Sequence, residues 1–163
     1  MTATPSAPLV FGTREFDALT ASAQASARRR KNFNFHPSDA DPSHRLLNAV
    51  EPDSYVCPHR HMEPNKDETL VVLRGSFGVA FFDERGNVTQ KAVISARGER
   101  MGVNIPRGVF HTLVALESGS VFLEAKAGPY DPATDKQLAP WAPPEGDASA
   151  GAYRATLRAL FGS

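Results

Sequence analysis

The sequence predicts an all-β fold, a sandwich or barrel of many short strands, with a short helix at each end. The first observation is that strand-like segments recur at roughly ten-residue spacing, separated by turns rich in Gly, Pro, Asp and Asn. The second is the length of 163 residues, which suits one domain with its own core. The third is an ordinary globular composition, 41% hydrophobic and 22% charged, which argues against disorder or a fibre.

The helix predicted near the beginning of the chain runs from Thr13 to about Arg30. Thr13 can cap it, and apolar side chains follow at helical spacing. The basic run 28–31 fills the last turn, where positive charge complements the helix dipole. The alternative for this run is a phosphate-binding site. A second short amphipathic helix is predicted over residues 153–161.

The strands expected between these helices show a two-residue alternation or a short apolar run bounded by turns. They cover residues 32–36, 45–50, 55–61, 68–75, 77–82, 88–94, 112–116 and 120–126. In the first of them Phe33 and Phe35 share one face, while Asn32, Asn34 and His36 share the other. That polar face meets either water or a cavity, and the pattern does not separate the two.

Composition divides the chain into three parts. We expect a tail and helix over residues 1–31, a barrel over 32–132, and a Pro/Ala-rich strap with a helix over 133–163. The first twelve residues are rich in Pro, Ala, Ser and Thr, which indicates a loose segment.

The charge balance limits the classes of partner. Lys and Arg number 18, as do Asp and Glu, so the formal net charge is zero. Nucleic acids and anionic membranes select a net basic surface, and neither is expected as a partner. Cys57 is the single cysteine, which excludes an internal disulfide framework. Because the beginning of the sequence lacks the pattern of a secretory signal and no stretch reaches the length of a membrane span, we expect a cytoplasmic protein.

His59 and His61 are the first candidates for a functional site. They lie two residues apart in a predicted strand, so both imidazoles point to one face, about 6–7 Å apart along the backbone. That separation suits joint ligation of one metal ion, although such a pair also occurs as two ordinary histidines at a strand end. Cys57 and Tyr55 share this face, and packing is the expectation for both.

Two spacings further along the chain extend this pair into a pattern. They are Glu68-(x6)-Gly75 and Pro106-x-Gly108-x-x-His111. With the His-x-His pair, they make the sequence resemble the cupin superfamily. The first motif of that superfamily runs Gly-(x5)-His-x-His-(x3–4)-Glu-(x6)-Gly, and the second runs Gly-(x5)-Pro-x-Gly-(x2)-His-(x3)-Asn.

The sequence departs from these motifs at several positions. Asp53 and Arg100 stand where the motifs have their opening glycines, and Ala115 replaces the closing asparagine. Six residues, rather than three or four, separate the second histidine from Glu68.

The longer loop offers other carboxylates as ligands. Glu63 and Asp67 both lie in it. Glu68 is preferred because its spacing to Gly75 is kept.

A narrower resemblance covers residues from about 28 to 132, which are similar to the WbuC-type cupin-fold metalloproteins. The segments that carry it are Asn34-Phe-His36, Arg45-Leu-Leu, Pro58-His-Arg-His61, Leu73-Arg-Gly75, Ile105-Pro-x-Gly-x-x-His-Thr-Leu-Val-Ala-Leu116 and Leu123-Glu-x-Lys-x-Gly-Pro-Tyr130-Asp-Pro. The resemblance implies a double-stranded β-helix (a jelly-roll barrel), a metal site, and occurrence near surface-polysaccharide pathways in bacteria. It names no reaction.

The metal ligands implied by the resemblance are His59, His61, Glu68 and His111. Three imidazoles and one carboxylate suit Fe, Mn, Ni, Co, Cu or Zn, and there is no second thiolate for a closed structural site. Four ligands leave up to two positions of an octahedral ion open, which a catalytic or substrate-binding ion needs. We therefore expect one divalent transition metal ion as the cofactor.

Glu124 and Lys126 are candidates for proton transfer. They share a strand face with Phe122. On an outer face they would form a weak solvated pair, whereas in the barrel lining they would be a charged pair beside the metal.

The resemblance is the main support for four other site residues. Tyr130 is expected as a further catalytic group. Asn34, His36 and Arg45 are expected to bind the substrate.

We expect a mononuclear metal-binding cupin, acting as an isomerase- or oxygenase-type metalloenzyme on a small polar, sugar-related molecule. One alternative is a non-catalytic module in which the ion only holds a ligand, as in a sensor. Another is a metal-independent epimerase of the cupin type, which needs a His–Asp base pair and no ion. Because cupins commonly pair through sheet edges, a homodimer is also expected.

Overall fold

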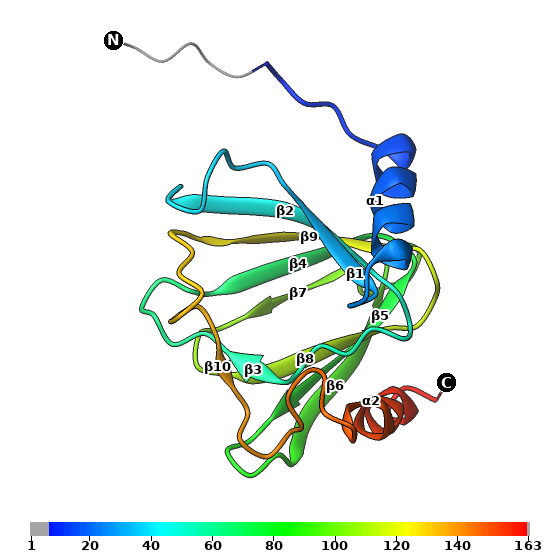
Figure 1. The fold of residues 1–163 in the computed structure, drawn as a ribbon, viewed down its shortest axis with the longest axis vertical. Helices are drawn as coiled ribbons and strands as arrows, with labels where there is room; N and C mark the ends of the chain where they lie inside the picture. Colours follow the sequence, from blue (N-terminus) through cyan, green and yellow to red (C-terminus); the bar gives the residue numbers. More distant parts are fainter. Residues whose placement is uncertain (1–6, 163) are drawn as a thin grey trace.

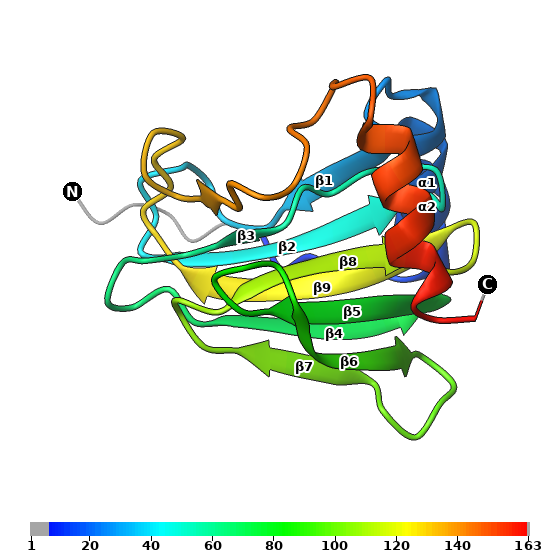
Figure 2. The same cartoon turned by 90° about the horizontal axis from the view of Figure 1, so that it is seen from below.

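The computed structural model describes residues 7–162, which form two antiparallel sheets packed face to face, with one helix on the outside of each (Figures 1 and 2). The elements are α1 (Thr13–Ala25), β1 (Arg30–Asn34), β2 (Ser43–Val50), β3 (His59–Arg60), β4 (Glu68–Arg74), β5 (Ser76–Phe82), β6 (Val88–Ser95), β7 (Gly102–Ile105), β8 (Phe110–Ala115), β9 (Ser120–Ala127), β10 (Gln137–Leu138) and α2 (Ala150–Ala159). Residues 1–6 lie outside the described part of the chain. The predictions of a loose segment and of no secretory signal both rest in part on these residues. The predicted all-β class with two short helices is confirmed.

The two sheets have five strands each. Their strand orders are β1-β2-β9-β4-β7 and β10-β3-β8-β5-β6. Consecutive strands of the chain therefore often lie in different sheets, so that side chains far apart in sequence meet between them. Antiparallel sheets packed in this way bury their inner faces against one another.

The main core lies between the sheets. It contains Phe77 from β5 and Phe122 from β9, whose rings meet edge to face with centroids 5.2 Å apart. Each side chain of this size contributes about 1.5–3 kcal/mol by leaving water. Val72 and Ile94 belong to the same cluster.

Both outer faces are covered in part, which explains why two strands lack an alternating burial pattern. On β2, Leu47 and Ala49 pack beneath Leu19 and Ala23 of α1. On β5, which is buried along its whole length, Phe82 and its neighbour Ala80 face the cluster that includes Leu157 of α2. Tyr55 and Cys57 belong to the same cluster, so the cysteine is a small apolar member of the core beside the C-terminal helix.

The first helix differs from the prediction at both ends. Its cap is Gly12, whose backbone N–H donates to Glu15 at 2.8 Å, so Thr13 is already helical. The helix ends at Ala25, and the basic run 28–31 lies in the following turn and at the beginning of β1. The prediction that this run fills the last helical turn was wrong, because the chain turns at Ser26, whose backbone is extended, to enter the sheet.

The strand predicted over residues 55–61 is also shorter than expected. Only His59 and Arg60 pair as a strand, against β8 and β10. In β1, the polar face that includes Asn32 and Asn34 borders a cavity. The Phe35 ring, just beyond the strand, packs against the core cluster beneath α1. Within residues 7–162 no helix has the length and apolarity needed to cross a membrane.

Candidate metal centre

Four buried side chains converge in the space between the two sheets. His59 lies on β3 directly opposite His111 on β8, and His61 follows β3 by one residue. Glu68, the first residue of β4, reaches them from the other sheet. One ligand atom from each of the four residues lies within 4.8 Å of the others.

Hydrogen bonds to backbone carbonyls define how the three rings are protonated. The Nδ1 atoms of His59, His61 and His111 face the carbonyl oxygens of Cys57, Asp135 and Val109 respectively. A carbonyl only accepts, so each Nδ1 carries the proton and each neutral ring directs the Nε2 lone pair toward the centre.

This arrangement leaves the centre rich in lone pairs and poor in donors. The Nε2 atom of His61 is buried and has no hydrogen-bond partner among residues 7–162. Nε2 of His111 lies 3.1 Å from Oε2 of Glu68, although neither atom carries a proton in the neutral-ring, ionised-carboxylate state. A cation at the common point would satisfy all four groups, so the donor set fits a divalent transition metal.

The electrostatics of the ligands agree with this assignment. Burial lowers the pKa of His59 well below its usual value, which keeps the ring neutral and its lone pair available. Burial alone would raise the pKa of Glu68, but the close contacts of its carboxylate with His111 and His61, followed by the charge of Lys126, hold it well below its usual value. The carboxylate is therefore ionised at neutral pH.

The other carboxylates of the long loop point elsewhere. Glu63 accepts a hydrogen bond from the Thr134 hydroxyl, and Asp67 accepts one from the backbone of Arg107. These contacts leave Glu68 as the carboxylate that faces the histidines.

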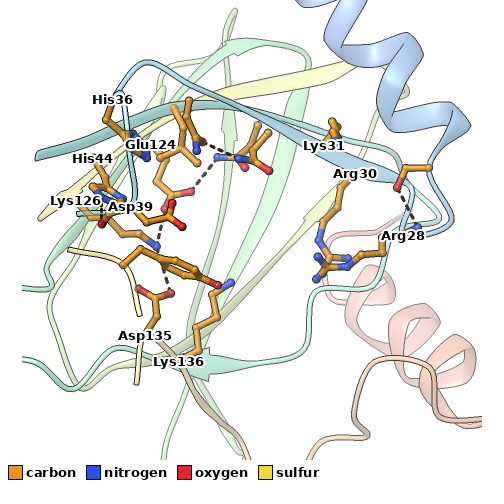
Figure 3. Close-up of a pocket in the computed structure, with 16 residues that line it drawn as sticks. Arg28, Arg30, Lys31, His36, Asp39, His44, Glu124, Lys126, Asp135 and Lys136 are labelled. Atoms are coloured by element: carbon orange, nitrogen blue, oxygen red, sulfur yellow. Dashed lines mark hydrogen bonds and ion pairs between the residues drawn. The ribbon is translucent and has the colours of Figure 1, made fainter. Parts of the chain in front are cut away.

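Two adjoining cavities give access to the centre. The inner one, of about 90 Å³, is bordered by His59, Glu68 and His111 together with apolar side chains. The outer one, of about 410 Å³, opens between β1, β2, β9 and the segment that follows β9 (Figure 3). Four residues border both cavities and mark the junction: Arg30, Asn48, Glu124 and Lys136.

Glu124 and Lys126 lie in the cavity wall, bonded to each other. Lys126 Nζ is 3.1 Å from Glu124 Oε1, and Asn48 donates to Glu124 Oε2 at 2.9 Å. Burial, followed by the nearby Glu68 carboxylate, raises the pKa of Glu124 to about 7. Burial alone would lower the pKa of Lys126, but Glu124, Glu68 and Asp135 hold it above its usual value. A neutral-range acid thus lies beside a permanent cation, an arrangement suited to proton transfer.

Asp135 connects this pair to the candidate metal ligands. It is buried, and its Oδ2 lies 3.6 Å from Lys126 Nζ while its backbone oxygen accepts from His61. Neither carboxylate oxygen has a hydrogen-bond partner among the described residues, and Lys66 Nζ lies 3.8 Å from Oδ1. Asp135 therefore orients one candidate metal ligand and lies between two buried ammonium groups.

The remaining predicted residues fall at different places. Asn34, His36 and Tyr130 border the outer cavity, and the His36 ring stacks on His44 with centroids 3.8 Å apart. Arg45 does not border either cavity: it is exposed and its guanidinium bonds the carbonyl of Ser43. Alternation along β2 sends its side chain to the face opposite His44.

Several cavity residues were not expected from the sequence. On β2 these residues are His44 and Asn48. The two-residue alternation of this strand, which sends Arg45 to the opposite face, could have indicated both of them. In the segment after β9 they are Asp135 and Lys136, for which no periodic signal exists because the segment is irregular.

Comparison with known proteins agrees with the architecture. The chain resembles CapF in complex with the inhibitor 3-isopropenyl-tropolone, with a TM-score of 0.58 and 20% identity over 69% of this chain. It also resembles the capsular polysaccharide assembling protein CapF from Staphylococcus aureus (TM-score 0.56, 19% identity, 69% of this chain) and oxalate decarboxylase from Bacillus subtilis (0.50, 19%, 67%). The matched region spans 32% of each of these CapF chains and 27% of the decarboxylase chain.

These likenesses show the fold, which is the cupin jelly roll. No curated protein matches the sequence significantly. One family model does match, over residues 11–94, which is about half of the chain and includes α1, three of the four candidate ligands and β5. The chain belongs to the family described as Domain of unknown function (DUF6016), on a cupin fold.

Proposed function

We propose that this protein is a mononuclear metalloenzyme in which His59, His61, Glu68 and His111 hold one divalent transition metal ion. The single observation that supports it best is the convergence of three Nε2 lone pairs and one carboxylate on a buried point, where Nε2 of His61 has no hydrogen-bond partner among residues 7–162. When bound, such an ion supplies Lewis acidity to an oxygen atom of the substrate.

The residues around the centre support catalysis over binding alone. Glu124 and Lys126 border the outer cavity, and Glu124 also borders the inner one beside Glu68. We assign Glu124 the role of exchanging a proton with the substrate and Lys126 the role of compensating the charge. A carboxyl whose pKa is raised to about 7 beside the candidate metal centre supports the catalytic role.

The substrate of this proposal is a small polar molecule. Asn34, His36 and Tyr130 would orient it in the outer cavity, and polar side chains predominate there. The sequence segments shared with WbuC-type proteins support a sugar-related substrate and a place in polysaccharide biosynthesis. The fold likeness to a capsular polysaccharide assembling protein does not by itself transfer that role.

Elemental analysis tests the metal. The protein is purified without an affinity metal or chelator, and its metal content is measured for the wild type, E68Q and H111Q. We expect about one ion per chain in the wild type and a loss in both variants. Even substitutions of the outer-shell partners of metal ligands typically cost about 10–100-fold in metal affinity. H36Q is the matched control, because this histidine lies outside the cluster. Wild-type protein that takes up no transition metal contradicts the proposal.

The expected homodimer remains part of the proposal. Light scattering of the purified chain measures it directly. A mass equal to one chain would remove it.

A further inference from the structure

The junction between the two cavities contains a lysine without a partner. Lys66, Lys91 and Lys126 donate to Pro129, Leu160 and Glu124 respectively. Lys136 has no hydrogen-bond or ion-pair partner among residues 7–162, yet it borders both cavities. In Figure 3 its ammonium end points from the segment after β9 toward the cavity.

The surroundings of this ammonium group favour an anion. Lys136 is an exposed residue. Burial, followed by the nearby Lys126, lowers the pKa of its ammonium group, while the carboxylates of Glu124, Glu68 and Asp135 act in the opposite direction. Its side chain borders both cavities, and its charge lies near that of Lys126. An ammonium group that borders two cavities, lies near a second cation and has no partner of its own can form a charge-assisted hydrogen bond with a bound anion.

Three other cations of the cavity are already compensated. Arg28 and Arg30 both bond Glu145, with N–O distances of 2.7 to 2.9 Å. Lys126 lies between the carboxylates of Glu124 and Asp135. Lys31 also has no hydrogen-bond or ion-pair partner among residues 7–162, but it borders only the outer cavity, whereas Lys136 borders both. Uncompensated positive charge at the junction is therefore available to a ligand at Lys136.

The rest of the cavity indicates the class of ligand. Small-molecule sites are commonly about 300–1,000 Å³, so the outer cavity of about 410 Å³ can hold a small organic molecule and the inner one of about 90 Å³ only a few atoms of it. The outer wall offers amides from Asn32, Asn34 and Asn48, and Leu46 is the single aliphatic side chain among its bordering residues. Amides both donate and accept, which suits hydroxyl groups.

We propose that Lys136 binds the acid group of a small polyhydroxylated organic acid at the junction of the two cavities, with the hydroxyl groups in the outer cavity. This assignment rests on the proposed function in naming the substrate class of the same site. The acid group at the junction then faces the histidine–glutamate cluster, and the amide-bearing strands β1 and β2 line the path of the hydroxyl groups.

A matched pair of probes tests the assignment. D-Gluconate and D-glucitol have the same number of carbons and differ in the acid group. Binding of each at millimolar concentration is measured by calorimetry and by ligand-observed NMR, with metal-loaded and with chelator-treated protein. We expect gluconate to bind wild-type protein at least about tenfold more tightly than glucitol, which corresponds to about 1.4 kcal/mol.

Three variants locate the acid group. K136M should lose the preference for gluconate, and K136R should retain it. K31M removes the same charge from another lysine that borders the outer cavity and should behave as the wild type. Equal binding of the two probes, no gluconate binding, or a preference that survives in K136M overturns the assignment.

Metal content separates this assignment from the proposed function. Lys136 is not one of the four candidate ligands, so K136M should keep the wild-type metal content and melting temperature. If the protein takes up no metal but gluconate binding still depends on Lys136, the metalloenzyme proposal fails and the acid-binding role stands. If metal is bound normally and K136M binds both probes as the wild type does, the acid-binding role of Lys136 fails and the metalloenzyme proposal stands.

Discussion

Oε2 of Glu68 lies 3.1 Å from Nε2 of His111, although the two residues are 43 positions apart and belong to opposite sheets. Both atoms carry lone pairs when the ring is neutral, because Nδ1 of His111 donates to the carbonyl of Val109. The contact therefore needs a cation or an additional proton between the two groups. This relationship connects the two halves of the sandwich at the candidate metal centre.

Metal binding should stabilise the fold, since the ligands come from both sheets. A transition metal present at about 100 times its dissociation constant contributes about 2.7 kcal/mol, which is about 5–10 °C in melting temperature for a chain of this size. Scanning calorimetry of chelator-treated protein, with and without added Mn²⁺ or Zn²⁺, measures the shift. E68Q should lose most of it, and H36Q should keep it; an unchanged melting temperature in the wild type contradicts the prediction.

Removing Lys126 should destabilise the protein strongly. Its side chain is 9% exposed and compensates the buried carboxylates of Glu124 and Asp135. K126M leaves these charges without their partner, which costs about 3–5 kcal/mol for a buried pair. Urea denaturation measures the loss, and the double variant E124Q/K126M should recover part of it. K91M changes the same charge at an exposed position and serves as the control. A loss below about 1 kcal/mol, as for a surface pair, would show that the cavity solvates both groups.

Truncating Phe77 should cost more than truncating an exposed residue of the neighbouring strand. The Phe77 side chain is 1% exposed and packs edge to face on Phe122. F77A should therefore lose about 3–5 kcal/mol of unfolding free energy. V93A, at a residue that is 43% exposed, should change it by less than about 0.5 kcal/mol. Equal effects of the two variants in urea would place the core elsewhere.

Stability should fall in acid partly through Glu145. Hydrogen bonding to Arg28, and then to Arg30, lowers the pKa of this carboxyl to about 2 against the effect of its partial burial. A lowered folded-state pKa stabilises the protein above the unfolded value of about 4.5, and that contribution is lost as the pH falls from there toward 2.

The corresponding variant is E145Q. It should be less stable than the wild type near neutral pH, and the difference should shrink as the pH falls toward about 3. Urea denaturation at several pH values measures this. E84Q, at a residue whose side chain is 74% exposed, should keep the wild-type pH slope. A difference between E145Q and wild type that is independent of pH would falsify the linkage.

Much of the fold could be predicted because local patterns determine it. The strands at residues 68–82 and 120–126 follow apolar alternation and turn chemistry, and they occur where expected. The predicted element boundaries were wrong where the packing of the whole chain overrides a local pattern. The basic run 28–31 has good helical composition, but the chain must turn after Ala25 to place β1 at the edge of its sheet.

For the candidate site, the sequence by itself named His59, His61, Glu68 and His111, because their spacing within strands and motifs is a short-range property. Only the tertiary structure decided that Glu124 and Lys126 face the cavity, since one alternating strand has two faces and nothing local tells which is inside. The tertiary structure also decided that Asp135 and Lys136 border the outer cavity. Asp135 meets His61 across 74 positions of sequence, and such a contact depends on how the whole chain closes around the core.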